Sequence, residues 1–200
     1  MLRSSSTSAI VGIFLFIPFD VSCRIGMKVE QIVATDIEAA DLKGERQMEQ
    51  AKIDSLVETR RLLLVNQTAA LSVLDPETSG PYGALVNFAV AAGVQPVILV
   101  SSLSRHTQAL LKDPRASLMV QSQLPAKGDP LTELRATITG SFIKSTAADM
   151  KAAYLQRHPY AELYANFGDF SFWMMQPEKL YVVAGFGRVY SFDFQNLVDA

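Results

Sequence analysis

The 200-residue sequence predicts a mainly β domain with flanking helices, of the α+β class. Many short segments alternate apolar with polar side chains or are continuously apolar, as strands do, and they outnumber the segments with helical spacing. Runs rich in proline, glycine, aspartate and serine separate these segments. The apolar content of 49% is enough for one sizeable core. We expect a small barrel or sandwich with helices packed outside.

Two regions are expected: an N-terminal extension over residues 1–49, loosely ordered, and one globular domain over residues 50–196. Residues 27–50 are charged and poor in large apolar side chains, which is typical of a loosely attached arm. The apolar run at residues 9–19 is too short to span a bilayer as a helix, which takes roughly 20 residues. No stable membrane span is therefore expected.

The first residues leave several interpretations open. Arg3 ahead of the apolar run gives residues 1–23 the outline of a secretory signal, whereas Asp20 fits that outline poorly. A lipid anchor at Cys23 and a true start at Met27 are further alternatives. We expect a cytoplasmic protein, with export as the alternative if residues 1–23 act as a signal peptide.

Helical segments are recognised by apolar spacing, caps and prolines. Ser104 and Thr146 stand where an N-cap hydroxyl accepts hydrogen bonds from the first N–H groups of a helix. Pro159 can occupy the first position of a further short helix, because proline lacks the N–H that is unpaired there. The predicted helices are residues 50–65, 105–112, 147–157 and 159–165.

Strand segments follow from alternation and from continuous apolar runs. Gly93 lies in a short connection where a positive φ costs little, which predicts a hairpin between its neighbours. Gln176-Pro177-Glu178 is read as a break between two strands, since proline cannot donate to a ladder. The predicted strand segments are residues 68–74, 84–91, 96–101, 116–121, 134–143, 170–175, 179–184 and 189–194.

Composition excludes several classes of function. The net charge of -2 offers no broad cationic surface for a phosphate backbone, so nucleic-acid binding is not expected. One cysteine and two histidines cannot form a zinc-type ligand cluster or an intramolecular disulfide. No spacing of serine, histidine and carboxylate supports a hydrolase. Any chemistry is therefore expected from carboxylates, hydroxyls, arginines or a borrowed cofactor, and no metal site is expected.

The most unusual segment runs from Val100 to Thr107, from a strand end into a helix start. It contains three serines, one threonine, Arg105 and His106. Free N–H groups at a helix start, hydroxyl donors and a guanidinium together suit a terminal phosphate, so we expect a phosphate-bearing ligand. The alternative is that the serines only cap the helix and Arg105 is a solvated surface charge.

Three stretches, 81–86, 97–120 and 129–142, resemble the FMN-binding split-barrel superfamily of pyridoxamine 5'-phosphate oxidase-like proteins in order and spacing. Residues 158–189, HPYAELYANFGDFSFWMMQPEKLYVVAGFGRV, resemble its haem-utilisation branch, the HugZ-like proteins. The resemblance covers most of residues 50–193. It implies a six-stranded, Greek-key split β-barrel that forms a homodimer, with FMN at the subunit interface.

The resemblance also implies which residues lie near FMN. Arg105 with His106 or Thr107 would contact the phosphate, the serines would lie along the ribityl chain, and the second strand would contact the ring through its main chain. Arg135 and Gly187 would reach the cofactor of the partner subunit. The implied cofactor-binding residues are Ala84, Leu85, Ser101, Ser102, Ser104, Arg105, His106, Thr107, Arg135 and Gly187.

Three functions remain open. The first is an FMN-dependent oxidoreductase acting on a small organic substrate, with no catalytic residue identified. Its candidate substrate-side residues are Tyr82, Arg135 and Arg188. The second is haem binding or haem degradation, with His158 or an arginine meeting the porphyrin, although His158 reads as a surface helix end. The third is a non-catalytic split barrel. The Arg-x-Glu-x-Trp and Arg-x-His elements of pyridoxamine phosphate oxidases are absent, which excludes that activity.

Overall fold

A computed structural model describes residues 29–123 and 127–200. The segment read as a possible signal, residues 1–23 with Cys23, and the alternative start at Met27 lie outside the described residues. Residues 45–200 form one compact unit, distinct from residues 1–44. The barrel and the candidate site both lie within this larger unit.

The first helix, α1 (Val29–Val65), begins much earlier than the expected residue 50. Its first part contains several alanine, glutamate and glutamine residues, which are good helix formers. Leu56, Leu62 and Leu63 near its end are buried in the barrel core. Among the described residues, no helix combines the length and the apolar character that crossing a membrane requires.

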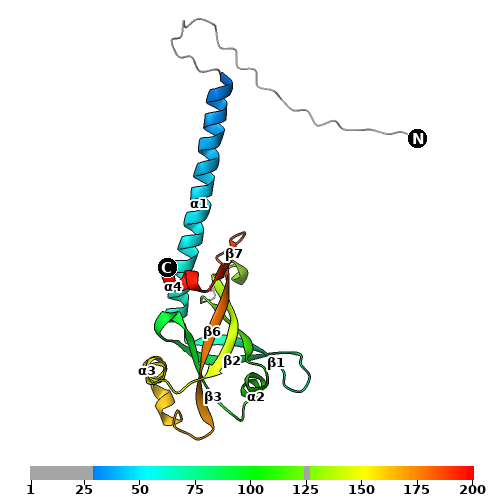
Figure 1. Ribbon diagram of the computed structural model, residues 1–200, viewed down its shortest axis with the longest axis vertical. Helices are drawn as coiled ribbons and strands as arrows, with labels where there is room; N and C mark the ends of the chain where they lie inside the picture. The colour runs from blue at the N-terminus through cyan, green and yellow to red at the C-terminus, as the bar shows by residue number, and fades with distance from the viewer. Residues whose placement is uncertain (1–28, 124–126) are drawn as a thin grey trace, which may run out of the picture. The chain divides into compact units, whose positions relative to one another are not determined.

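The strands form one antiparallel sheet in the order β3-β2-β1-β4-β5-β6-β7, and pairing of β3 with β6 closes six of them into a barrel (Figure 1). This confirms the predicted six-stranded barrel with flanking helices; β7 is an extra strand beside β6. Strand β2 starts at Pro81, three residues earlier than predicted. Proline is tolerated there because the first residue of a strand need not donate an N–H to the ladder. The strands are β1 (Thr68–Leu74), β2 (Pro81–Val90), β3 (Pro96–Ser101), β4 (Arg115–Gln121), β5 (Arg135–Lys144), β6 (Phe170–Val183) and β7 (Val189–Asp193).

Strand β6 is continuous, so the prediction of two strands separated at residues 176–178 was wrong. The ladder to β5 shifts register between Thr139 and Gly140, and Glu178 is the extra residue in β6. The β6 side chains in the barrel core are odd-numbered before the shift, as at Met175, and even-numbered after it, as at Leu180. Gly140 lies so close to Gln176 that an added Cβ would overlap its carbonyl oxygen. A bulge thus accommodates the proline.

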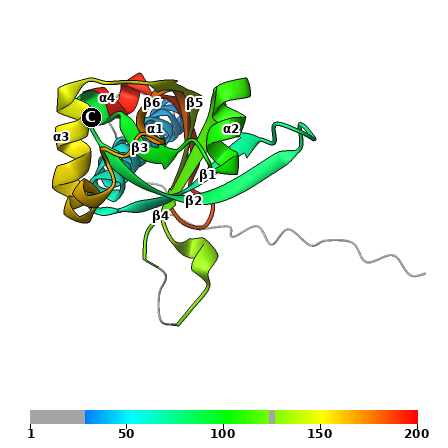
Figure 2. The same ribbon diagram turned by 90° about the horizontal axis from the view of Figure 1, so that it is seen from below.

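The remaining helices are short. Helix α2 has the predicted bounds, while α3 starts at Ala148 with Ala147, not Thr146, at the N-cap position. In both views α2 and α3 lie on opposite sides of β3 (Figures 1 and 2). The C-terminal α4 was not predicted, because five residues are too few for a periodic pattern. The helices are α2 (Arg105–Lys112), α3 (Ala148–Arg157) and α4 (Gln195–Asp199), with 3-10 turns at Ala92–Val94, Pro130–Thr132 and Pro159–Leu163.

Two apolar clusters hold the fold together. The larger fills the barrel and includes Leu197 of α4, and the smaller lies between β3, β6 and α3 around Tyr154 and Phe172. Strand β3 therefore contributes to both clusters, which explains its continuous apolar sequence. Gly93 has φ +68° in the hairpin between β2 and β3, as predicted. The end of β3 leads directly to the candidate site.

Candidate functional site

The turn between β3 and α2 is held by hydroxyl groups. The Ser104 hydroxyl donates to the Ser101 carbonyl oxygen over 2.6 Å, and Thr107 Oγ1 lies 3.1 Å from Ser104 Oγ. The expected capping role of Ser104 was wrong, since its side chain accepts no bond from an N–H group of α2. Thr107 is only 1% exposed, so its hydroxyl stabilises the turn and does not face a ligand.

A groove of about 360 Å³ opens beside this turn. Its lining is mostly apolar and aromatic and comes from the two hairpin strands β2 and β3, the start of α2, and the segment around α3 and β6. Pockets of this character bind small organic ligands and cofactors. The lining residues are Leu85, Val86, Asn87, Leu99, Val100, Ser101, Ser104, His106, Tyr154, Tyr164 and Phe170.

His106 is the nitrogen ligand that this groove offers. Its imidazole is half-buried and makes no hydrogen bond to any residue in the described part of the chain. Burial lowers the pKa of His106, so the ring is neutral near pH 7 and one nitrogen keeps a free lone pair. Burial also raises the pKa of Tyr154 and of Tyr164, which both remain phenols. The groove lining is therefore uncharged at neutral pH.

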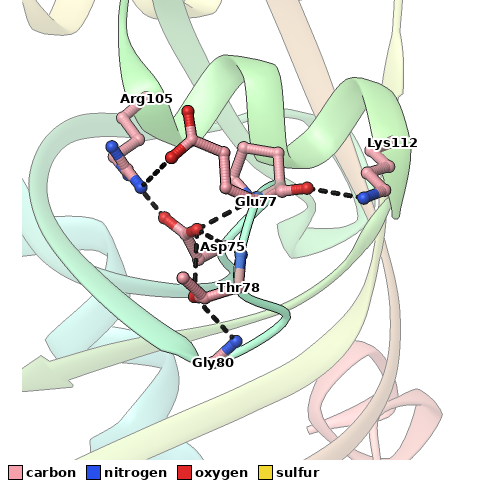
Figure 3. A network of polar contacts seen from close by, with 7 residues as sticks. Asp75, Glu77, Thr78, Gly80, Arg105 and Lys112 are labelled. Carbon is pink, nitrogen blue, oxygen red and sulfur yellow. Dashed lines mark hydrogen bonds and ion pairs between the residues drawn. The ribbon is translucent and has the colours of Figure 1, made fainter.

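Arg105 points toward the loop between β1 and β2 (Figure 3) and is not part of the groove lining. Its Nε donates to Asp75 Oδ2, and its Nη2 lies 3.3 Å from Glu77 Oε2. We call Asp75, Glu77 and Arg105 the carboxylate clasp. The hydrogen bond from Arg105 is the main reason that the pKa of Asp75 lies far below its usual range. Two of the five guanidinium N–H groups are thus engaged by carboxylates.

Asp75 also organises the loop that it belongs to (Figure 3). Its Oδ1 accepts from the N–H groups of Glu77 and Thr78, each at 3.0 Å, and from Thr78 Oγ1 at 3.1 Å. Lys112 at the other end of α2 donates to the Pro76 carbonyl oxygen. The carboxylate is only 6% exposed. The loop is therefore fastened along the length of α2.

A third carboxylate, that of Asp169, lies beside the groove and is bonded to Ser101 in the groove lining. The Ser101 hydroxyl donates to Asp169 Oδ2 over 2.6 Å, and the Ser102 N–H donates to the Asp169 carbonyl oxygen over 2.7 Å. A phosphate here would meet the charge of Asp169, and the clasp already engages Arg105. The residues present therefore fit the phosphate of FMN poorly, although the segment has the composition that suggested it.

Residues 49–196 match the family model described as CREG, beta-barrel. The chain belongs to this family. It is 33% identical over 139 residues, 68% of its length, to the non-canonical haem oxygenase HOZ, chloroplastic, of Arabidopsis thaliana, and covers 42% of that protein. The structure of a haem-binding protein from Mycobacterium smegmatis has a TM-score of 0.67 and 28% identity, over 73% of this chain and 60% of that one.

A third comparison concerns the fold alone. A Clostridium acetobutylicum protein related to general stress protein 26, of the pyridoxinephosphate oxidase family, has a TM-score of 0.56 at 11% identity, over 72% of this chain and 98% of that one. Together the matches confirm the predicted split-barrel superfamily and its haem-utilisation branch. This chain spans less than half of the plant relative.

The CREG-type barrel brings some of the predicted cofactor residues together and leaves others apart. Leu85, Ser101, Ser104 and His106 line one groove, whereas the buried Thr107 and the clasped Arg105 do not. Ala84 is half-buried on β2, and Ser102 follows the end of β3. Two further predicted residues do not line the groove of a single chain: Arg135, which donates to the Leu131 carbonyl oxygen over 2.8 Å, and Gly187, which has φ +74° in the turn before β7.

His158 is buried, not at the surface as expected. Its Nε2 lies 2.8 Å from the Phe88 carbonyl oxygen, which can only accept, so Nε2 carries the hydrogen. Nδ1 therefore accepts from the Tyr160 hydroxyl at 2.9 Å. Both ring nitrogens of this fully buried side chain are engaged. His158 links the turn after α3 to β2 and offers no nitrogen to a porphyrin.

Sequence reasoning missed three residues of this barrel site: Asp75, Glu77 and Asp169. The first two stand in a run, 75–81, that reads as turn chemistry, and Asp169 reads as another turn residue. Each does serve a turn, but each also binds a side chain from a distant segment. No spacing along the chain indicates that these carboxylates bind the segment around Ser101 and Arg105, because they meet it only in the folded chain.

Proposed function

We propose that the chain is a haem-binding protein that holds the porphyrin ring in the groove between β2, β3 and α2. Two relatives support this: the plant protein carries the name haem oxygenase, and the mycobacterial protein is described as haem-binding. The lining of the groove supports it independently, because a porphyrin is a large apolar ring that packs on aromatic and aliphatic side chains. The two carboxylates of haem lie at one edge of the ring and can stay in water.

His106 is the proposed iron ligand, and it carries this function. A neutral imidazole nitrogen is a common ligand of haem iron, and the groove presents one that makes no hydrogen bond to the described residues. His158 cannot take this role, since Phe88 and Tyr160 engage its two nitrogens. Bound haem supplies the redox chemistry, while the chain binds the ring, holds it in place and shields one of its faces.

We further propose a homodimer that covers the open side of the groove. Leu85 is 77% exposed at the rim, and it starts a row across five strands. The ladder partners place Leu85, Ala70, Met119, Thr137 and Tyr181 side by side on the outer face of β2, β1, β4, β5 and β6. Leu85, Met119 and Tyr181 in this row are exposed, and a mostly apolar row of this kind suits a second copy of the same surface. Light scattering tests it: we expect twice the chain mass of 21.9 kDa, and a monomer would contradict it.

Haem titration of the purified chain tests the main proposal. Wild type is expected to shift and sharpen the Soret band at one haem per subunit. His106→Ala is expected to lose affinity at least about tenfold, equivalent to ~1.4 kcal/mol, and to change the spectrum of any haem still bound. Leu111→Ala, an exposed change on the same helix, is the control and should bind like wild type. Equal spectra for His106→Ala and wild type would reject His106 as the ligand.

An FMN-dependent oxidoreductase acting on a small molecule is the second candidate. The hydroxyl-rich turn at residues 101–104 and the resemblance to FMN-binding barrels favour it. The absorption spectrum of the purified chain separates the two candidates, because flavin and haem have different bands. Release of FMN at one equivalent per subunit would favour this second candidate over the first.

A further inference from the structure

The segment from Ser101 to Thr107 has the composition of a phosphate site, but its arginine is used elsewhere. Ser104 and His106 line the groove, while Arg105 between them donates to Asp75 and Glu77 on another loop. A guanidinium is the strongest recognition group for a phosphate among protein side chains, since it donates two parallel bonds with a full charge. Engagement by two carboxylates removes that group from the groove.

The negative charges of Asp169 and Asp75 also oppose the binding of a phosphate. Asp169 accepts from Ser101, which lines the groove, and Asp75, which accepts from Arg105, is almost fully buried. A buried carboxylate paired with an arginine cannot lose its partner without leaving an uncompensated charge. A dianionic phosphate would therefore have to compete with Asp75 and Glu77 for Arg105 and also approach Asp169. Both steps oppose binding.

We propose that the carboxylate clasp sets the specificity of this groove against phosphomonoester ligands, FMN among them, by holding Arg105 on the loop between β1 and β2. In this view Asp75 and Glu77 are specificity-determining residues, although neither lines the groove. The consequence is a gain of binding: removing their charges releases Arg105 and raises affinity for a phosphorylated ligand over its unphosphorylated counterpart. The clasp acts in this way whether or not haem is the physiological ligand.

The atoms of Asp75 allow a conservative change. Oδ1 accepts the three hydrogen bonds that shape the loop, and Oδ2 accepts only from Arg105. In Asp75→Asn the side-chain oxygen can keep the Oδ1 bonds, and the NH₂ group that replaces Oδ2 cannot accept from Arg105. Glu77→Gln removes the second charge at an exposed side chain. The double variant therefore releases Arg105 while the loop keeps its hydrogen bonds.

The experiment compares FMN with riboflavin, which has the same ring and no phosphate, on the full chain. The readout is the ratio of the two affinities from fluorescence quenching. Wild type is expected to give a ratio near one, and Asp75→Asn/Glu77→Gln a ratio about tenfold higher, the range expected for one charge-assisted contact. Glu77→Gln alone should give a smaller increase, and this exposed change does not threaten folding.

Two further variants serve as controls. Asp113→Asn breaks the Asp113–Arg115 ion pair at the other end of α2, which joins Arg115 Nη2 and Asp113 Oδ2 over 2.6 Å, and should leave the ratio unchanged. Arg105→Ala in the double variant should abolish the gain, because it removes the released guanidinium.

Each outcome decides the matter. A wild-type ratio far above one, no rise in the double variant, or a rise that survives Arg105→Ala would overturn the proposed clasp role. Haem titration of the same variants keeps this result separate from the haem proposal. The clasp variants are expected to bind haem like wild type, so a failed FMN gain leaves the haem result unaffected, and a failed haem titration leaves the FMN ratio interpretable.

Discussion

The two histidines of the chain have the same side chain and opposite surroundings. His158 is completely buried, and both of its ring nitrogens are hydrogen-bonded to the chain. His106 is half-buried at the groove and makes no hydrogen bond within the described residues. The chemistry of an imidazole is therefore fixed by what its nitrogens already bind. His158 is part of the scaffold, and His106 is available to a ligand.

The largest effect that would sharpen this comparison is on stability. His158→Ala removes two hydrogen bonds, leaves the Phe88 carbonyl oxygen without its partner and opens a void beside Tyr154. We expect the free energy of unfolding to fall by roughly 2–4 kcal/mol. His106→Ala should change it by less than about 1 kcal/mol, since no hydrogen bond is lost. Urea denaturation of both variants measures the difference.

A similar fall in the free energy of unfolding for His158→Ala and His106→Ala would contradict the distinction between the two histidines. If His106→Ala destabilised the fold as much as His158→Ala, His106 would have to be counted as part of the scaffold. Its role as an available ligand would then lose its physical basis. Circular dichroism of the folded baselines would show whether either variant retains the native secondary structure before denaturant is added.

A smaller effect concerns pH. Only the neutral imidazole can bind iron, and burial holds the pKa of His106 below its ordinary value of 6.5. Haem affinity should therefore be constant between about pH 8 and pH 7 and should decline only below about pH 6, as protons compete with the iron. Haem titrations at several pH values measure this. The acid decline should be missing in His106→Ala; its persistence there would assign it to another group.

Much of the fold could be predicted because it depends on local patterns. Alternation along residues 134–143 and the apolar run of residues 96–101 give β5 and β3 nearly at their observed bounds. The start of α1 was missed, because the charged composition of residues 27–50 favoured a loosely attached arm although alanine, glutamate and glutamine are also good helix formers. The continuity of β6 depends on a bulge opposite Gly140, a feature of the pair of strands and not of either strand alone.

The candidate site was predictable only in part. The segment around Ser104 and His106 could be singled out because its unusual composition is local, and both residues line the groove. The partners of Arg105 were not found, since Asp75 and Glu77 precede it by about thirty residues and meet it only in the folded chain. The burial of His158 was missed for the same reason: its hydrogen-bond acceptor, the Phe88 carbonyl oxygen, lies on another strand.

The bulge in β6 also constrains how this gene can vary. In the part of β6 after Glu178, the extra residue of the bulge determines which side chains face the barrel core and which face outward. Deleting or inserting a single residue there would turn Leu180 and Val182 from the core to the outside and bring Tyr181 in. Insertions and deletions of one residue should therefore be absent at this position among functional variants of the chain, while substitutions of the exposed Glu178 itself should be common.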